Sequence, residues 1–127
     1  MSDQTEPLVI AVREDHAAVL TLNRPAKKNA MSDALLGELI AALTDANRDD
    51  DVRAIIIKGA GPCFTSGRDT SQFEQAALLQ DMSVDAAVDI FLETLSMLIE
   101  SPKPTIAAIH GMALGGGQAM SLACDFV

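Results

Sequence analysis

Hydrophobic and polar residues repeat along the chain with two different periods, and these periods predict strands that alternate with helices. Residues 8–13 and 17–22 are short runs rich in β-branched residues around a polar turn at Asp15, which predicts an antiparallel hairpin. Residues 53–58, RAIIIK, place three isoleucines between polar ends, which is typical of a parallel strand covered on both faces. Residues 104–109 predict another buried strand.

Three further segments carry the spacing of helices. Ser32 is suited to cap a first helix, because apolar residues recur behind it at helical spacing until Asn47. Residues 84–100 show a second long amphipathic pattern, which Pro102 ends. Residues 118–123 predict a short helix of small residues that follows a glycine-rich turn.

The predicted order is strand, strand, helix, strand, helix, strand, helix, which is the order of a spiral α/β domain. Residues 71–80 fit either a short helix or a loop, and residues 125–127 resemble the start of a further strand. A hydrophobic content of 49% with 21% charged residues indicates a globular chain. We therefore expect a single globular core.

Charge and cysteine content narrow the possible partners. The formal net charge of -9 would repel a nucleic-acid backbone, so nucleic-acid binding is not expected. The acidic N-terminus has no export signal, and glycines and polar residues interrupt the most apolar stretch, residues 106–123, so a membrane span is not expected. Cys63 and Cys124 have no metal-binding spacing, which predicts packed, reduced thiols in a cytoplasmic protein and no metal site.

Two glycine-containing loops are the best candidates for chemistry. Residues 59–73, GAGPCFTSGRDTSQF, follow the RAIIIK strand at the sheet edge where α/β proteins bind ligands. Gly67 can supply the unusual backbone dihedrals that direct an N–H group into a cleft. Residues 110–125, HGMALGGGQAMSLACD, place three glycines before a helix, whose free N–H groups favour negative charge. Close packing of that helix on the sheet is the alternative explanation of the glycines, and neither loop matches a phosphate-binding or dinucleotide motif.

Three segments together resemble the enoyl-CoA hydratase/isomerase (crotonase) superfamily over nearly the whole chain. They are LTLNRPAKKNAMS, RAIIIKGAGPCFTSGRD and PKPTIAAIHGMALGGGQAMSLACD. The resemblance implies an α/β fold with a crotonase-like ββα spiral core. On this resemblance, residues 1–127 are the N-terminal part of a single acyl-CoA-binding domain, ending before the family's C-terminal trimerisation helices. It also implies that an acyl-CoA thioester is the substrate, that no separate cofactor is needed, and that the full-length protein is a homotrimer or hexamer.

The resemblance also assigns roles to residues. The backbone N–H groups of Arg68 and Gly116 match the oxyanion hole, which holds the thioester oxygen while an enolate forms. Family members usually have a small or apolar residue in place of Arg68, and we expect its side chain to be a solvated partner of Asp69. The residues that match the CoA- and substrate-binding positions are Lys27, Lys28, Asn29, Ala30, Asp69, Thr70 and Ser71.

The chain departs from the hydratase pattern at Ala119. Hydratases of this family position water with two glutamates, and Ala119 stands where the first is expected, while the second would follow Val127. The isomerase branch tolerates an apolar residue there, and FTSGRD resembles that branch more closely. We therefore expect an isomerase rather than a hydratase. A dehalogenase, decarboxylase or hydrolase of the superfamily, an acyl-CoA binder without catalysis, and an inactive fragment are the alternatives.

Other reactive side chains have simpler explanations. His16 falls in the predicted hairpin turn and His110 at the end of a buried strand, positions typical of structural histidines. Ser121 follows a glycine turn as in Clp-type peptidases, but both histidines precede it, contrary to the order in those peptidases.

Overall fold

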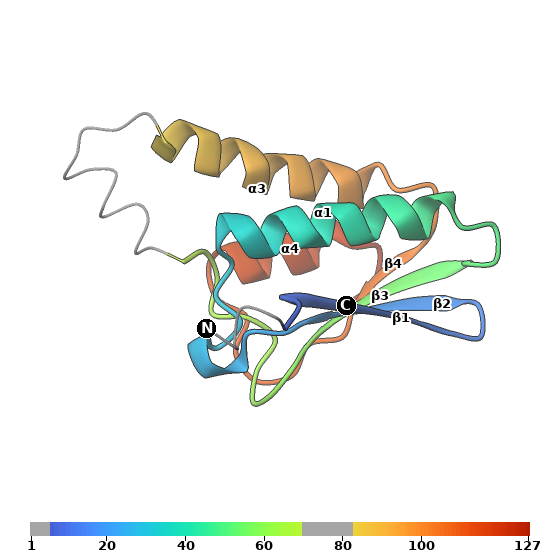
Figure 1. Cartoon of the computed structure of the whole chain (residues 1–127), viewed down its shortest axis with the longest axis horizontal. Helices are drawn as coiled ribbons and strands as arrows, with labels where there is room; N and C mark the ends of the chain where they lie inside the picture. The colour runs from blue at the N-terminus through green and yellow to red at the C-terminus, as the bar shows by residue number, and fades with distance from the viewer. Residues whose placement is uncertain (1–5, 70–82) are drawn as a thin grey trace.

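The computed structural model describes residues 6–69 and 83–127, with residues 83–89 described by their backbone only. The strands and helices follow the predicted order, with one added 3-10 turn, and are coloured along the chain in Figure 1. They are β1 (Val9–Glu14), β2 (Ala17–Leu22), η2 (Pro25–Lys27), α1 (Asp33–Arg48), β3 (Ala54–Gly59), α3 (Ser83–Ile99), β4 (Thr105–Ala107) and α4 (Gly116–Ala123).

The sheet has four strands in the order β1-β2-β3-β4. β1 and β2 are antiparallel and pair Val9 with Leu22 and Glu14 with Ala17, which confirms the predicted hairpin. Asp15 in its turn has a positive φ of 55°, as tight hairpin turns require. β2 is parallel to β3, and β3 is parallel to β4, so the segments that follow β3 and β4 leave the same edge of the sheet.

The helices lie on one face of this sheet. Figure 1 shows α1 next to the strands and α3 beyond it, and α3 contacts both α1 and α4. The side chains between these layers are fully buried, and each buried leucine or isoleucine contributes about 1.5–3 kcal/mol to stability. The core residues with no exposed surface include Leu22, Leu35, Leu36, Leu39, Leu43, Ile55, Ile57 and Phe64.

Most sequence predictions for single elements are confirmed, and three need correction. Ser32 caps α1, since its hydroxyl accepts a hydrogen bond from the Leu35 N–H at 3.2 Å. β3 is fully buried on one face only, because Ile56 on the other face is partly exposed. The predicted strand 104–109 is shorter, spanning Thr105–Ala107, because its paired register with β3 ends at Ile57 and Ala107.

The last helix also starts earlier than predicted. α4 begins at Gly116 instead of residue 118, so two of the three glycines lie inside the helix. The strand expected at 125–127 is present as a single parallel bridge between Phe126 and Ile106. The ambiguous segment 71–80 lies outside the described residues. Within the described part of the chain, no helix is both long and apolar enough to cross a membrane.

Candidate functional site

The two glycine loops of the sequence lie side by side. Residues 59–69 leave β3, and residues 110–117 connect β4 to α4. The Phe64 N–H donates to the His110 carbonyl oxygen at 2.8 Å, and Thr65 forms a parallel bridge with Ala113. Two hydrogen bonds form this bridge: the Thr65 N–H donates to the Met112 carbonyl, and the Thr65 carbonyl accepts from the Leu114 N–H. The parallel arrangement of β3 and β4 therefore continues into the two loops beyond the strands.

The peptide unit between Gly67 and Arg68 has a fixed orientation. The Gly67 carbonyl oxygen accepts from the Met31 N–H at 2.8 Å, and the Asp69 N–H donates to the Met31 carbonyl at 3.1 Å. In such a parallel bridge the residue between the two bonded neighbours directs its own N–H away from the partner strand. The Arg68 N–H, the first predicted donor, consequently points away from Met31.

The second predicted donor lies next to this peptide. Gly67 has a φ of 101°, and a Cβ built on it would lie 2.7 Å from the Leu114 carbonyl oxygen and 3.4 Å from the Gly116 backbone nitrogen. Gly116 is the first residue of α4, where backbone N–H groups have no acceptor within the helix. The structure thus brings the Arg68 and Gly116 segments together.

Apolar and aromatic atoms surround Gly116. A Cβ built on this glycine would lie 3.1 Å from the Phe91 ring, 3.2 Å from the Met31 methyl group and 3.4 Å from Cγ of Arg68. The Arg68 guanidinium carbon lies 6.0 Å from the centre of the Phe91 ring. Backbone donors in such surroundings interact more strongly with a developing charge than they would in water.

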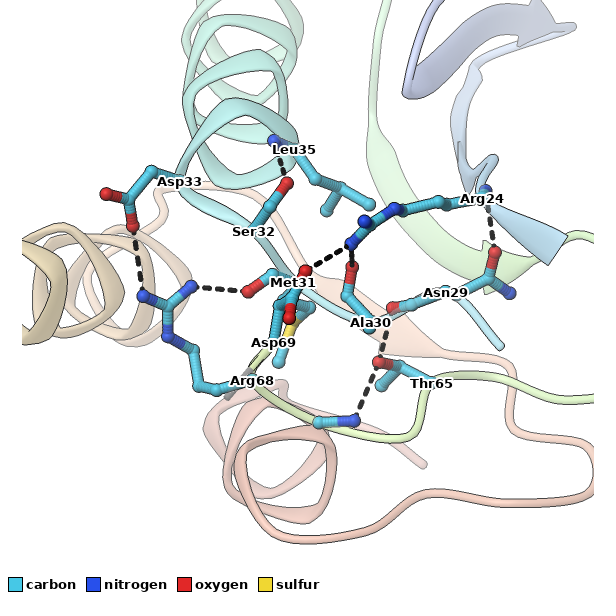
Figure 2. Close-up of polar contacts among 11 residues, drawn as sticks. Arg24, Asn29, Ala30, Met31, Ser32, Asp33, Leu35, Thr65, Arg68 and Asp69 are labelled. Carbon is cyan, nitrogen blue, oxygen red and sulfur yellow. Dashed lines mark hydrogen bonds and ion pairs between the residues drawn. The ribbon is translucent and has the colours of Figure 1, made fainter. Parts of the chain in front are cut away.

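Asn29 holds the first loop in place. It is fully buried, and its side-chain amide donates to the carbonyl oxygens of Ala60, Cys63 and Phe64 at 2.9–3.1 Å. Its side-chain oxygen accepts from the Arg24 N–H at 2.8 Å (Figure 2). Its polar side-chain atoms all have internal partners, so this side chain positions the loop. The predicted contact of Asn29 with the ligand stays a prediction.

Charged residues around the first loop form ion pairs, and the Arg68 side chain is more buried than expected. The Arg68 side chain is only 10% exposed, and its guanidinium pairs with the Asp33 carboxylate at 3.0 Å and donates to the Met31 carbonyl. Asp69 accepts from Arg24 at 2.9 Å, as Figure 2 shows. The prediction of a solvated Arg68 side chain is therefore wrong, because the guanidinium is packed between the start of α1 and the Phe91 ring.

The remaining predicted binding residues lie at the surface beside this network. Lys27 ends η2 and Lys28 follows it, and both side chains are exposed. Ala30 is partly exposed, and its carbonyl accepts from the Arg24 guanidinium at 3.0 Å. Thr70 and Ser71 lie outside the described residues.

A groove of about 700 Å³ runs beside Lys27 and the start of α1. Its described lining combines the basic Arg24 and Lys27 with the acidic Glu6 and Glu38, and it takes no residue from the glycine loops. Glu38 there accepts from the N–H groups of Leu8 and Val9 at 2.8 and 3.1 Å. The groove is therefore separate from the pair of donor segments.

Other candidate groups do not join this site. Ser121 is 4% exposed and donates to the Gln118 carbonyl of its own helix at 2.8 Å. His16 and His110 are exposed, and their ring nitrogens lie 3.0 and 2.8 Å from backbone oxygens of Asp51 and Gly61. Each ring thus contacts the backbone, as is typical of structural histidines, and their role stays a prediction.

The two cysteines are buried in the fold. Cys63 and Cys124 are buried free thiols, as predicted, and burial raises the pKa of Cys124 to about 11, so that thiol stays protonated at neutral pH. Among residues 6–69 and 83–127, no group of three His, Cys, Asp or Glu side chains is arranged to hold a metal ion.

Sequence reasoning missed three residues that shape the site. Arg24 joins Ala30 to Asp69, Asp33 pairs with Arg68, and the Thr65 hydroxyl donates to the Asn29 carbonyl and accepts from the Gly67 N–H (Figure 2). Thr65 lies in the loop between the RAIIIK strand and Gly67. This position was the sequence signal that could have identified it as a site residue.

Comparisons with known proteins agree on one group of relatives. A sequence model described as "Enoyl-CoA hydratase/isomerase" matches residues 13–127. The mitochondrial Delta(3,5)-Delta(2,4)-dienoyl-CoA isomerase of Mus musculus is 36% identical over 129 residues, which cover 94% of this chain and 39% of the mouse protein. An enoyl-CoA hydratase structure from Bacillus anthracis has 38% identity and a TM-score of 0.84 over 94% of this chain and 46% of its own. An enoyl-CoA hydratase/isomerase structure from Xanthobacter autotrophicus Py2 has 35% identity and a TM-score of 0.79. The match covers 95% of this chain and 45% of that one. The chain spans less than half the length of these relatives.

Proposed function

Because the chain belongs to the enoyl-CoA hydratase/isomerase family, we propose that the whole protein acts on an acyl-CoA thioester through an enolate held by the N–H groups of Arg68 and Gly116. The observation that carries this proposal is the close approach of their two loops, in which the Gly116 nitrogen lies 3.4 Å from the Cβ position of Gly67. A preorganised donor of this kind contributes about 2.7–4 kcal/mol to transition-state stabilisation. CoA is part of the substrate, so the proposal includes no separate cofactor.

The proposed reaction is movement of a double bond. A carboxylate from outside the 127 residues removes a proton from the carbon next to the thioester, and the electron pair moves onto the carbonyl oxygen. Return of a proton to the γ-carbon shifts the double bond from the β,γ position to the α,β position. One base and an oxyanion hole suffice, whereas hydration also needs a group that positions water. Ala119 in α4 has no side-chain atom that could hold this water, which favours isomerisation.

The exposed pair Lys27 and Lys28 is proposed to hold the CoA phosphates. Both lie at the surface of a chain with a formal net charge of -9, where a strongly anionic ligand needs local positive charge. The Arg24 guanidinium, by contrast, is already engaged by Ala30 and Asp69. Assembly into a trimer or hexamer and a cytoplasmic location stay predictions.

An assay of both reactions on the full-length protein tests the proposed function. We expect wild-type protein to isomerise a β,γ-enoyl-CoA far faster than it hydrates an α,β-enoyl-CoA. Ala119→Glu supplies the missing carboxylate and should raise hydration relative to isomerisation. Ala41→Glu, a change of the same chemistry at an exposed position of α1, is the control and should alter neither rate. Brisk hydration by wild type would show that another group holds the water.

Binding without catalysis is the second candidate function, and Ala119 is the observation that favours it. Full-length protein that binds acyl-CoA tightly but turns over neither substrate would support this alternative and refute the isomerase. Protein that binds no acyl-CoA at all would refute both.

The lysine pair has its own test. The double variant Lys27→Glu, Lys28→Glu should bind an acyl-CoA more weakly than wild type and with a smaller dependence on salt. The control is Arg48→Glu, Arg53→Glu, which makes the same charge change on exposed residues at the opposite end of α1. Equal affinities and salt slopes for the two double variants would exclude a local clamp.

A further inference from the structure

Thr65 contacts both loops that carry the proposed donors. It is fully buried, and its hydroxyl donates to the Asn29 carbonyl oxygen at 2.7 Å and accepts from the Gly67 N–H at 3.0 Å. Its backbone N–H donates to Met112 at 3.0 Å, and its carbonyl accepts from Leu114 at 3.3 Å. One side chain and its own peptide groups thus join three separate segments of the chain.

The hydroxyl fixes the first donor through Gly67. The N–H of Gly67 is bound by the Thr65 oxygen and its carbonyl by the Met31 N–H, so both sides of this glycine are held. Gly67 has a φ of 101°, a conformation in which glycine has much freedom unless neighbouring groups restrain it. Since the Gly67 carbonyl and the Arg68 N–H belong to one planar peptide, restraining Gly67 also sets the direction of that N–H.

The methyl group of Thr65 sets the spacing to the second donor. A Cβ built on Gly117 would lie 2.5 Å from Cγ2 of Thr65, so the start of α4 rests directly on this methyl group. Gly116 precedes Gly117 in the first turn of the helix. The contact between Gly117 and the Thr65 methyl group therefore also fixes the distance of Gly116 from the first loop.

We propose that Thr65 is the positioning residue of the oxyanion hole, with its hydroxyl orienting the Arg68 N–H and its methyl group setting the distance to the Gly116 N–H. The inference rests on the proposed function, because it assumes that these two groups bind a thioester oxygen. Thr65 touches no substrate in this account and acts only through the two backbone donors.

Two single substitutions separate the roles of the hydroxyl and the methyl group. Thr65→Val keeps the methyl group and removes the hydroxyl, while Thr65→Ser keeps the hydroxyl and removes the methyl group. Thr94→Val is the matched control, because Thr94 is equally buried and its hydroxyl donates within α3, to the Ile90 carbonyl at 2.9 Å. If Thr65→Val does not fold, Thr65→Cys is compared with Thr65→Ser instead, since both lack the methyl group and the thiol is the weaker hydrogen-bonding group.

The main measurement is the absorbance of a conjugated aryl-acryloyl-CoA bound to full-length protein. Polarisation of its carbonyl by two donors shifts the absorption to longer wavelength, and a purely structural role of Thr65 would leave that shift unchanged. We expect Thr65→Val to lose most of the shift and to lower kcat about tenfold to a hundredfold at nearly constant KM, because loss of a whole donor costs a hundredfold or more. Thr65→Ser keeps the hydroxyl that orients the Arg68 N–H and changes only the spacing to Gly116, so it should lose part of the shift and of kcat, but less than Thr65→Val. Thr94→Val should keep both.

The outcomes distinguish the inference from the proposed function. A wild-type protein that binds acyl-CoA with a red shift, together with a Thr65→Val variant of equal shift and kcat, would overturn the inference alone. Equal losses in Thr65→Val and Thr65→Ser would overturn the division between hydroxyl and methyl group. A wild-type protein that binds the probe without any shift would overturn the oxyanion hole itself and the inference with it.

Discussion

The two loops of the candidate site are held in opposite ways. Residues 59–69 are bound by buried polar side chains, above all Asn29 and Thr65, and by the ion pair of Arg24 with Asp69. Residues 110–117 have mostly exposed or partly exposed side chains and are bound to the first loop mainly through backbone hydrogen bonds, with one side-chain contact from the His110 ring to the Gly61 carbonyl. The first loop is therefore formed by the fold, whereas the second takes its position from the first.

Glycines complete this difference. A Cβ on Gly111 or Gly117 of the second loop would lie 2.5 Å from an atom of the first loop. A side chain at either position would push the loops apart. The second loop therefore needs glycine at its contacts with the first loop, whereas the first loop needs the polar side chains that hold it. The comparison predicts that loss of the side-chain hydrogen bonds to the first loop costs stability, and that added side chains in the second loop increase the distance between the loops.

The largest expected effect is that of Asn29→Ala. It leaves the Ala60, Cys63 and Phe64 carbonyl oxygens without their side-chain donor in a buried site. Each unsatisfied buried group costs about 1–3 kcal/mol, so we expect the free energy of unfolding to fall by about 3–5 kcal/mol, or the protein not to fold. Denaturant unfolding followed by circular dichroism measures the loss.

Lys28→Ala is the control for this prediction. Lys28 has a φ of 53°, close to the 55° of its neighbour Asn29, but its side chain is exposed. Its replacement should change stability by less than about 0.5 kcal/mol, as is usual at exposed positions. If both variants lost equal stability, the left-handed backbone and not the buried amide would be what holds the first loop.

Gly117→Ala should have the next largest effect. The added methyl group would meet Cγ2 of Thr65 at 2.5 Å, so α4 must move away from the first loop. Overpacking of this kind costs about 1–3 kcal/mol. Gly37→Ala is the control, because Gly37 lies inside α1 with nothing near its Cβ position, and there alanine should stabilise the helix by about 0.5–1 kcal/mol.

A second substitution sharpens this test. Thr65→Ser removes the methyl group that the new alanine meets, so Gly117→Ala should cost less in that background than in wild type. Additive effects of the two substitutions in denaturant unfolding would show that α4 is not seated on the Thr65 methyl group.

The sequence was sufficient for the elements and for the position of the loops, because both depend on local patterns. The spacing behind Ser32 predicted α1, and the three motif segments predicted that Gly67 and Gly116 belong to one site. The start of α4 was misplaced because glycines carry no side chain that could show a helical period.

The internal bonding of the site could not be predicted in the same way. Asn29 bonds to carbonyl groups 31–35 positions away, and Arg68 pairs with Asp33, which is 35 positions away. Such contacts depend on how β3 and α1 lie relative to each other in space. In the sequence alone, these polar residues cannot be told from polar residues at the surface. The buried side chain of Arg68 was missed for that reason.

The smallest expected effect is that of Asp33→Asn, which removes the carboxylate facing Arg68 and keeps its shape. The Arg68 side chain is 10% exposed but that of Asp33 is 49% exposed, so water screens the pair and we expect a loss of about 0.5–1 kcal/mol at low salt. Part of this loss is the favourable position of a carboxylate in the first turn of α1. Asp51→Asn is the control, because it breaks the more exposed pair with Arg13, of 50% and 71% exposure, and should cost almost nothing. Urea unfolding of both variants at low and high salt gives the comparison, and the cost of Asp33→Asn should shrink as salt rises. A salt-independent loss of several kcal/mol would mean that this ion pair, and not the neutral hydrogen bonds of Asn29 and Thr65, holds the first loop in position.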